Sequence, residues 1–134
     1  MAAVDLDEAR LAPLVELIRA NGGEAMAIGA DVAVNANVQA IVARTEAAFG
    51  LPNVLFNNAG VDTEGKRSIL EIDEAAFDKV VEVNLKGVWL MIKHVAPRMI
   101  AAGDESSFAT AADFVNDAGW TAMSGISVQD FAKG

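Results

Sequence analysis

The segment "NVLFNNAG" at residues 53–60 indicates the fold class. It holds a continuous apolar run from Val54 to Phe56, followed by two asparagines, an alanine and a glycine. Strands that are apolar on both faces are typical of parallel sheets covered by helices, whereas strands with one solvated face alternate apolar and polar residues. The segment therefore predicts a buried parallel strand that ends in a polar loop.

Helical periodicity flanks this segment on both sides. Residues 35–50 carry apolar side chains at helical spacing, and Asn35 is expected to cap that helix. Residues 73–102 have the strongest helical pattern in the chain, with Asp73 as the expected N-cap. Strands that alternate with helices through short loops favour an α/β layer structure with a parallel sheet.

Three residues interrupt the pattern of the 73–102 helix. Gly87 and Pro97 predict a bend or a division into two helical pieces. Asn84 places an amide on an otherwise apolar stripe, where it must find hydrogen-bond partners. Asn84 is therefore either a site residue or an asparagine that is satisfied by a neighbouring loop.

The first part of the chain predicts a helix followed by a strand. Residues 7–23 show helical spacing up to a pair of glycines, and Pro13 requires that the helix begins later than Asp7 or bends. Residues 24–32 are short, apolar and bounded by turn residues, as in a buried strand.

The composition excludes several classes of function. The chain has 134 residues, of which 53% are hydrophobic, so we expect one globular domain. A net charge of −9 without a basic cluster disfavours nucleic acid and anionic membranes as partners. The absence of cysteine excludes disulfides and thiolate ligands, and no signal peptide or transmembrane run is visible. We therefore expect a cytoplasmic protein.

Polar residues follow the apolar runs where ligands bind in parallel α/β folds, at the carboxyl ends of strands. Asp5, Asp31, Asn57 and Asn58 hold such positions. Asp5 is either an acceptor for ribose hydroxyls or a helix cap shared with Asp7. The asparagines and the following Ala59 and Gly60 either admit a ligand to the main chain or form an ordinary turn. His94 is the only histidine, so we expect no metal site.

Four motifs in order, "VDLDEARL", "ADV", "NVLFNNAG" and "FDKVVEVNLKGVWL", resemble the short-chain dehydrogenase/reductase family of NAD(P)-dependent oxidoreductases. The resemblance implies an alcohol or carbonyl substrate and a preference for NAD, because Asp5 stands where an acidic residue favours NAD over NADP. It also implies a catalytic role for Asn84. The implied cofactor-binding residues are Asp5, Asp31, Val32, Asn57, Ala59 and Gly60.

The same resemblance implies that large parts of the family's domain are missing. The first strand with its Gly-rich phosphate loop is absent, and Gly103 runs directly into a segment at 104–122 that resembles the family's C-terminal strand region. The catalytic serine and the Tyr-x-x-x-Lys motif belong to the missing block, and the chain has no tyrosine. We therefore expect an inactive chain with weak NAD binding.

The expected fold is an incomplete Rossmann-like three-layer α/β domain that lacks the family's first, fifth and sixth strands. It would form a single partial domain over residues 1–134, with the front section at 1–103 and a tail at 123–134. In the family's strand order, 3-2-1-4-5-6-7, we expect the remaining strands not to be neighbours. A non-catalytic alternative is a module that pairs with relatives or with itself through the 73–102 helix.

Overall fold

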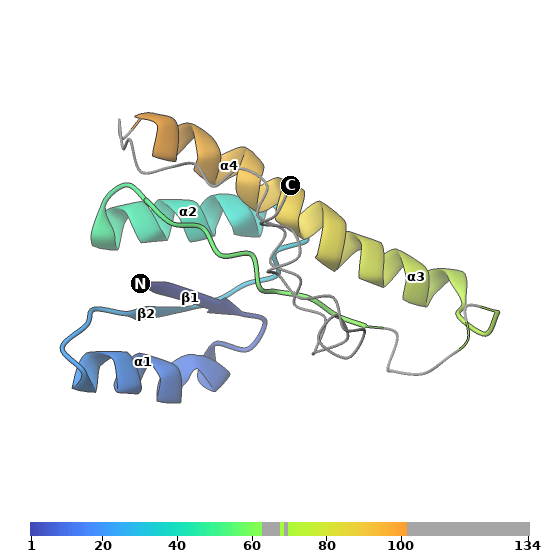
Figure 1. The fold of residues 1–134 in the computed structure, drawn as a ribbon, viewed down its shortest axis with the longest axis horizontal. Helices are drawn as coiled ribbons and strands as arrows, with labels where there is room; N and C mark the ends of the chain where they lie inside the picture. Colours follow the sequence, from blue (N-terminus) through green and yellow to red (C-terminus); the bar gives the residue numbers. More distant parts are fainter. Residues whose placement is uncertain (63–67, 69, 102–134) are drawn as a thin grey trace, which may run out of the picture.

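The structure is a computed structural model that describes residues 1–62, 68 and 70–101 (Figure 1). The expected strand region at 104–122 and the tail at 123–134 lie outside the described residues. The elements in chain order are β1 (Ala2–Asp5), the 3-10 helix η1 (Glu8–Leu11), α1 (Ala12–Ala20), β2 (Met26–Gly29), α2 (Asn35–Phe49), α3 (Glu74–Val81), the π-helical segment η2 (Glu82–Gly87) and α4 (Val88–Ala101).

The two strands form a parallel sheet that helices cover on both sides. β1 and β2 pair in register from Ala2 with Met26 to Asp5 with Gly29. α1 lies on one face of this sheet, and α2 and α4 lie on the other (Figure 1). This arrangement confirms the predicted incomplete three-layer α/β fold. The expectation that no remaining strands are neighbours is wrong for β1 and β2, which pair with each other. They correspond to the family's second and third strands, which are adjacent in the order 3-2-1-4-5-6-7.

The predicted strand at residues 54–56 is wrong. The described part of the chain contains a two-stranded sheet, and residues 53–62 form neither a strand nor a helix. Val54 is 76% exposed and Phe56 is 66% exposed, so the apolar run is not buried on both faces. An apolar run becomes a strand only where a neighbouring strand pairs with its backbone. The local sequence pattern contains no information about whether such a neighbour is present.

The first helix begins late, as Pro13 allows. Asp7 caps the 3-10 helix η1, and its Oδ1 accepts a hydrogen bond from the Ala9 amide at 3.0 Å. α1 then starts at Ala12, so Pro13 falls in its first turn, where no intrahelical bond from the amide is needed. The helix stops at Asn21, and Gly22 takes a positive φ of 80°.

The predicted cap of α2 is wrong by one residue. Val34 is the N-cap, and Asn35 is the first helical residue. The Asn35 Oδ1 atom instead lies 2.8 Å from Nε2 of His94 on α4. A second polar contact between these helices joins Arg98 Nε to Glu46 Oε1 at 2.8 Å. Asn35 therefore links two helices rather than satisfying the first turn of its own.

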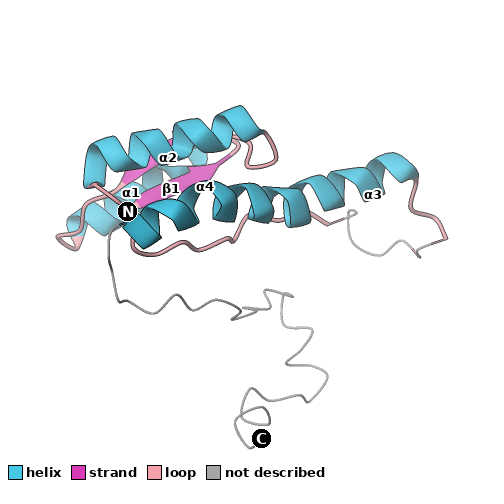
Figure 2. Ribbon diagram, turned by 90° about the horizontal axis from the view of Figure 1, so that it is seen from above, coloured by secondary structure: helices cyan, strands magenta, loops and turns pink. Residues whose placement is uncertain are grey.

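Residues 74–101 form a continuous helical run that contains a π-helical segment (Figure 2). The predicted cap is confirmed, because Asp73 Oδ1 accepts a hydrogen bond from the Ala76 amide at 2.8 Å. The expected division into two pieces takes the form of the π segment at 82–87, which ends at Gly87, while Pro97 lies inside α4. A Cβ atom on Gly87 would lie 3.0 Å from Cγ2 of Val32, so glycine permits this close approach.

The core lies between the sheet and the helices on its two faces. Val38 on α2 and Ile28 on β2 are the largest fully buried side chains. Other buried apolar residues include Leu11, Val15, Ile41, Val42, Val83, Leu90 and Val95. None of the helices in the described part is long and apolar enough to cross a membrane.

Candidate functional site

A cavity of about 800 Å³ is lined by residues of β1, α2, η2, α4 and the 50–61 segment. Its wall includes every residue that was predicted from the sequence to bind the cofactor. These are Asp5, Asp31, Val32, Asn57, Ala59 and Gly60. Three separate segments of the chain, at 5, 31–32 and 57–60, therefore meet at one concave surface. Ligands of parallel α/β folds bind at such a surface, outside the carboxyl ends of the strands.

The cavity wall has an apolar part and a polar part. The apolar part comes mainly from the helices and includes Ile41, Val42, Phe49, Val88, Met91 and Val95. The polar part lies at the carboxyl ends of β1 and β2 and in the 50–61 segment, and includes Asp5, Arg10, Asp31, Asn57 and Asn58. Small-molecule sites typically combine an apolar wall with a few polar groups of this kind.

Asp5 ends β1 and carries the clearest acceptor in the cavity. Its Oδ1 atom accepts a hydrogen bond from the Asp7 amide at 3.1 Å and lies 3.7 Å from Nη1 of Arg10. Within residues 1–62, 68 and 70–101, no donor contacts Oδ2. Asp7 is the N-cap of the following 3-10 helix, and Asp5 in turn binds the amide of this N-cap residue, so both alternatives for Asp5 stay open. The structure leaves one Asp5 oxygen available to a ligand.

Asp31 and Val32 follow β2 and hold the loop that leads into α2. Asp31 Oδ1 accepts a hydrogen bond from the Ala33 amide at 2.8 Å, and Oδ2 lies 3.9 Å from Nζ of Lys79 on α3. Val32 lies close to Gly87 on η2, where a Cβ atom would be 3.0 Å from its Cγ2 atom. Asp31 and Val32 therefore both join this loop to the long helix. These contacts fix the wall of the cavity next to Asp5.

Asn84 clamps the end of the 50–61 segment. Its Oδ1 accepts a hydrogen bond from the Val61 amide at 2.8 Å, and its Nδ2 donates to the Val61 carbonyl at 2.9 Å. Asn84 is exposed and does not line the cavity itself. Both ends of its amide are therefore satisfied by a neighbouring loop, and its catalytic role stays a prediction.

We expect Asn84→Ala to lower the free energy of unfolding by about 1–2 kcal/mol, because two hydrogen bonds to the main chain are lost. Because alanine has a higher helix propensity than asparagine, a loss of stability would come from the two lost hydrogen bonds to Val61. Urea unfolding measures this change, and amide hydrogen exchange at Val61 should accelerate. Gln39→Ala removes an exposed amide from α2 and serves as the control. Equal effects of the two substitutions, with unchanged exchange at Val61, would contradict the prediction.

In the described part of the chain, no group of three or more histidine, aspartate or glutamate side chains is placed to hold a metal ion. His94 is half-buried and contacts Asn35, away from the polar wall of the cavity.

The model of the family described as short chain dehydrogenase matches residues 1–109 of this chain. The chain belongs to the short chain dehydrogenase family. It is 33% identical over 125 residues to an uncharacterized oxidoreductase of Bacillus subtilis, YxbG, covering 90% of this chain and 45% of that protein. It is 40% identical over 103 residues to an uncharacterized oxidoreductase of Thermotoga maritima, covering 77% of this chain and 39% of the relative.

Solved structures of the family agree with the fold. A short chain dehydrogenase/reductase from Burkholderia phymatum in complex with NAD superimposes with a TM-score of 0.71 at 35% identity, over 77% of this chain and 36% of that one. A metagenomic short-chain oxidoreductase in complex with NADP gives 0.69 at 34% identity, over 75% and 45%. The chain thus spans less than half the length of these relatives.

Two charged residues near the cavity were not predicted from the sequence. Arg10 lines the cavity and contacts Asp5, and Lys79 contacts Asp31 from α3. Arg10 stands five positions after Asp5, so a search for basic residues near the strand end would have found it. Lys79 is distant in sequence from Asp31, and only the tertiary structure brings the two together.

Proposed function

We propose that the cavity binds the adenosine half of a nicotinamide dinucleotide, and that NAD is preferred over NADP. The observation that carries this proposal is the convergence of all six nominated residues on one cavity wall. The free Oδ2 of Asp5 can accept hydrogen bonds from the two ribose hydroxyls, while its charge disfavours a phosphate on the 2′-oxygen. The apolar wall formed by α2 and α4 suits the adenine ring.

The affinity of this site for NAD should be weak. A phosphate-binding loop of the form G-x-G-x-x-G does not occur in the sequence, so the pyrophosphate has no such cradle. The binding energy must therefore come from contacts with the adenosine half, made by Asp5, Asp31, Val32 and the 50–61 segment.

The family membership supports an oxidoreductase ancestry with a secondary alcohol or its carbonyl as the substrate class. In this proposal the 134-residue chain does not catalyse that reaction by itself, because it contains no tyrosine to exchange a proton with the substrate oxygen. In this proposal Asn84 corresponds to the family's catalytic asparagine, and its side-chain amide binds the Val61 backbone. The absence of cysteine agrees with a cytoplasmic location.

Removal of the Asp5 carboxylate tests the proposed site. Asp5→Ala should lower NAD affinity about tenfold or more, because hydrogen bonds to a charged acceptor contribute about 1.5–3 kcal/mol. Isothermal titration calorimetry measures the change. Asp78→Ala removes the same charge from the exposed face of α3 and should leave the affinity within about twofold, since long-range surface charge effects are screened. Unchanged NAD binding in Asp5→Ala would refute the assignment.

A second candidate function is a non-catalytic pairing module. Large apolar side chains lie exposed along the α3–η2–α4 run, namely Phe77, Leu85, Trp89, Ile92 and Ile100. Exposed apolar surface of this extent is typical of interaction sites. The partner would be a second copy or a full-length relative. Size-exclusion chromatography of the chain, alone and mixed with a full-length relative, separates this function from nucleotide binding.

A further inference from the structure

One edge of the sheet faces the cavity. The Met26 amide donates a hydrogen bond to the Met1 carbonyl at 2.9 Å, which turns the backbone groups of Met1 toward β2. Because the backbone groups of successive strand residues alternate in direction, those of Ala2 and Val4 point away from β2. Ala2 and Val4 both line the cavity. In the described part of the chain, no strand pairs with this side of β1.

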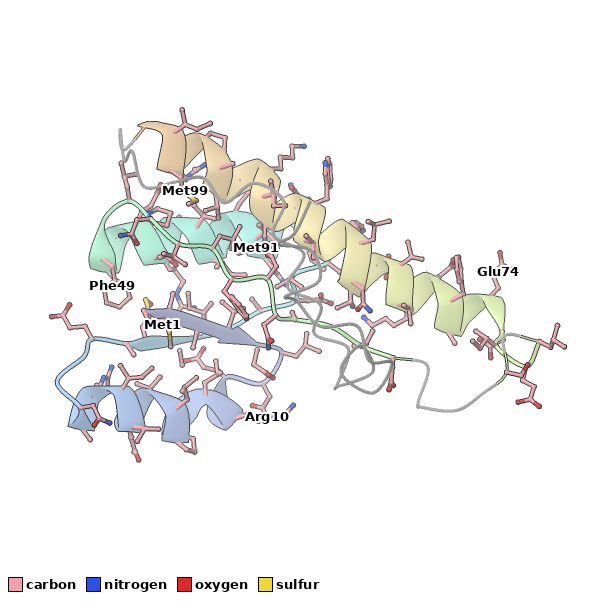
Figure 3. All side chains as sticks on the ribbon, in the orientation of Figure 1. Met1, Arg10, Phe49, Glu74, Met91 and Met99 are labelled. Carbon is pink, nitrogen blue, oxygen red and sulfur yellow. The ribbon has the colours of Figure 1, made fainter. Side chains whose placement is uncertain are left out.

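The space beside this edge has mainly apolar walls. Val54 and Leu55 of the 50–61 segment line it, and Val54 is 76% exposed. Figure 3 shows three further lining side chains, which come from the N-terminus, the end of α2 and the side of α4, namely Met1, Phe49 and Met91. The charged residues of the wall lie at the carboxyl ends of the strands. A molecule that fills the rest of the space therefore needs apolar side chains.

We propose that the cavity takes up an extended apolar segment of another polypeptide, which adds to the free edge of β1 as a third strand. The amide and carbonyl groups of Ala2 and Val4 pair with the backbone of that segment, and its side chains pack against the apolar walls. The proposal goes beyond the proposed function, because its contacts are the β1 backbone and Val54 rather than the Asp5 carboxylate.

Charge and space define the kind of partner. The chain has a net charge of −9, which attracts a segment with basic residues on both sides of its apolar run. A second copy carries the same negative charge, and its own β1 edge faces its own cavity. A separate strand reaches the edge more easily than a whole folded copy. We therefore expect an apolar segment of about five residues, the usual length of a strand, with lysine or arginine at its ends.

A synthetic peptide with alternating valine and isoleucine between paired lysines tests the proposal. Chemical-shift titration of the full chain measures its affinity, and hydrogen exchange locates the contact. Exchange of the Val4 amide should slow about tenfold or more, whereas the Ala3 amide, which faces β2, should change little. The same peptide with a central proline cannot complete the ladder and should bind at least about tenfold more weakly. Glutamates in place of the lysines should weaken binding as strongly at low salt.

Val54→Asn places a polar group in the apolar wall and should lower the affinity for the lysine peptide about tenfold. Leu17→Asn is the matched control, because Leu17 is 61% exposed on α1 and lies outside this cavity. It should leave the affinity within about twofold. Equal losses in the two variants, or equal binding of the proline peptide, would overturn the proposal.

The chain without peptide provides a further test. A dimeric mass together with slow exchange of the Val4 amide would assign the edge to a second copy and overturn the proposal too. None of these measurements requires NAD, so a failure of the strand site leaves the proposed nucleotide site to be judged by Asp5→Ala.

Discussion

Incubated with NAD and a panel of secondary alcohols, the purified chain is expected to produce no NADH above the buffer control. Hydride transfer from an alcohol requires that a base takes the hydroxyl proton, and positioned general bases contribute about 10²–10⁴-fold to such rates. The sequence has no tyrosine. The described residues that line the cavity include no histidine or lysine either.

His94 and the lysines of the described region that carry a contact bind other side chains, and Lys79 binds Asp31. His94 contacts Asn35, the Lys86 ammonium lies 3.7 Å from Glu82, and Lys93 lies over the Trp89 ring at 4.7 Å. In the proposed function, Asp5 and Asp31 bind the adenosine half of the dinucleotide rather than the reacting alcohol. We therefore expect none of these side chains to act as the proton acceptor.

A full-length relative, assayed with its own substrate in the same buffer, shows that the assay detects turnover. NADH formation by the 134-residue chain that disappears in Asp5→Ala would refute the expected inactivity. Activity that is unaffected by Asp5→Ala would point to a contaminating dehydrogenase, so this variant separates the two sources of signal.

Ile28→Ala should have the largest effect on folding, a loss of about 2–5 kcal/mol in the free energy of unfolding. Ile28 lies on β2 opposite Val4 of β1 and is 2% exposed. Removing its side chain leaves a cavity in the core of a very small sheet, where few other contacts can compensate. Since small domains have a total stability of about 5–15 kcal/mol, circular dichroism should record a markedly lower melting temperature.

Ile100→Ala is the matched control, because it deletes the same atoms from a side chain that is 70% exposed on α4. Surface substitutions of this kind usually change stability by less than about 0.5 kcal/mol. Similar melting temperatures for Ile28→Ala and Ile100→Ala would show that β2 is not part of the folded core.

The local features of the fold were predictable from the sequence, because neighbouring residues determine them. The Asp73 cap, the late start of α1 at Pro13 and the interruption at Gly87 follow from backbone constraints within one or two turns. The strand at 26–29 follows from its short apolar run between turn residues. Asp5 and Asp31 were predicted to bind a ligand because they follow strands.

The predictions that failed depended on partners that are distant in the sequence. The apolar run at 54–56 lacks the strand structure that its pattern predicted, because a strand requires a paired neighbour. Asn35 was expected to cap its helix, but His94, which is 59 positions away, contacts its side-chain oxygen. A local pattern contains no information about such partners.

The sequence by itself determined the family, the helices with the Asp73 cap, and the absence of a tyrosine that could exchange a proton with an alcohol. Only the tertiary structure decided that the nominated residues line one cavity, that Arg10 lies beside Asp5, and that Asn84 holds the Val61 backbone. The physical reason is the range of the interactions. Caps and periodicity act within a few residues, whereas a cavity forms where segments far apart in the chain pack against one another.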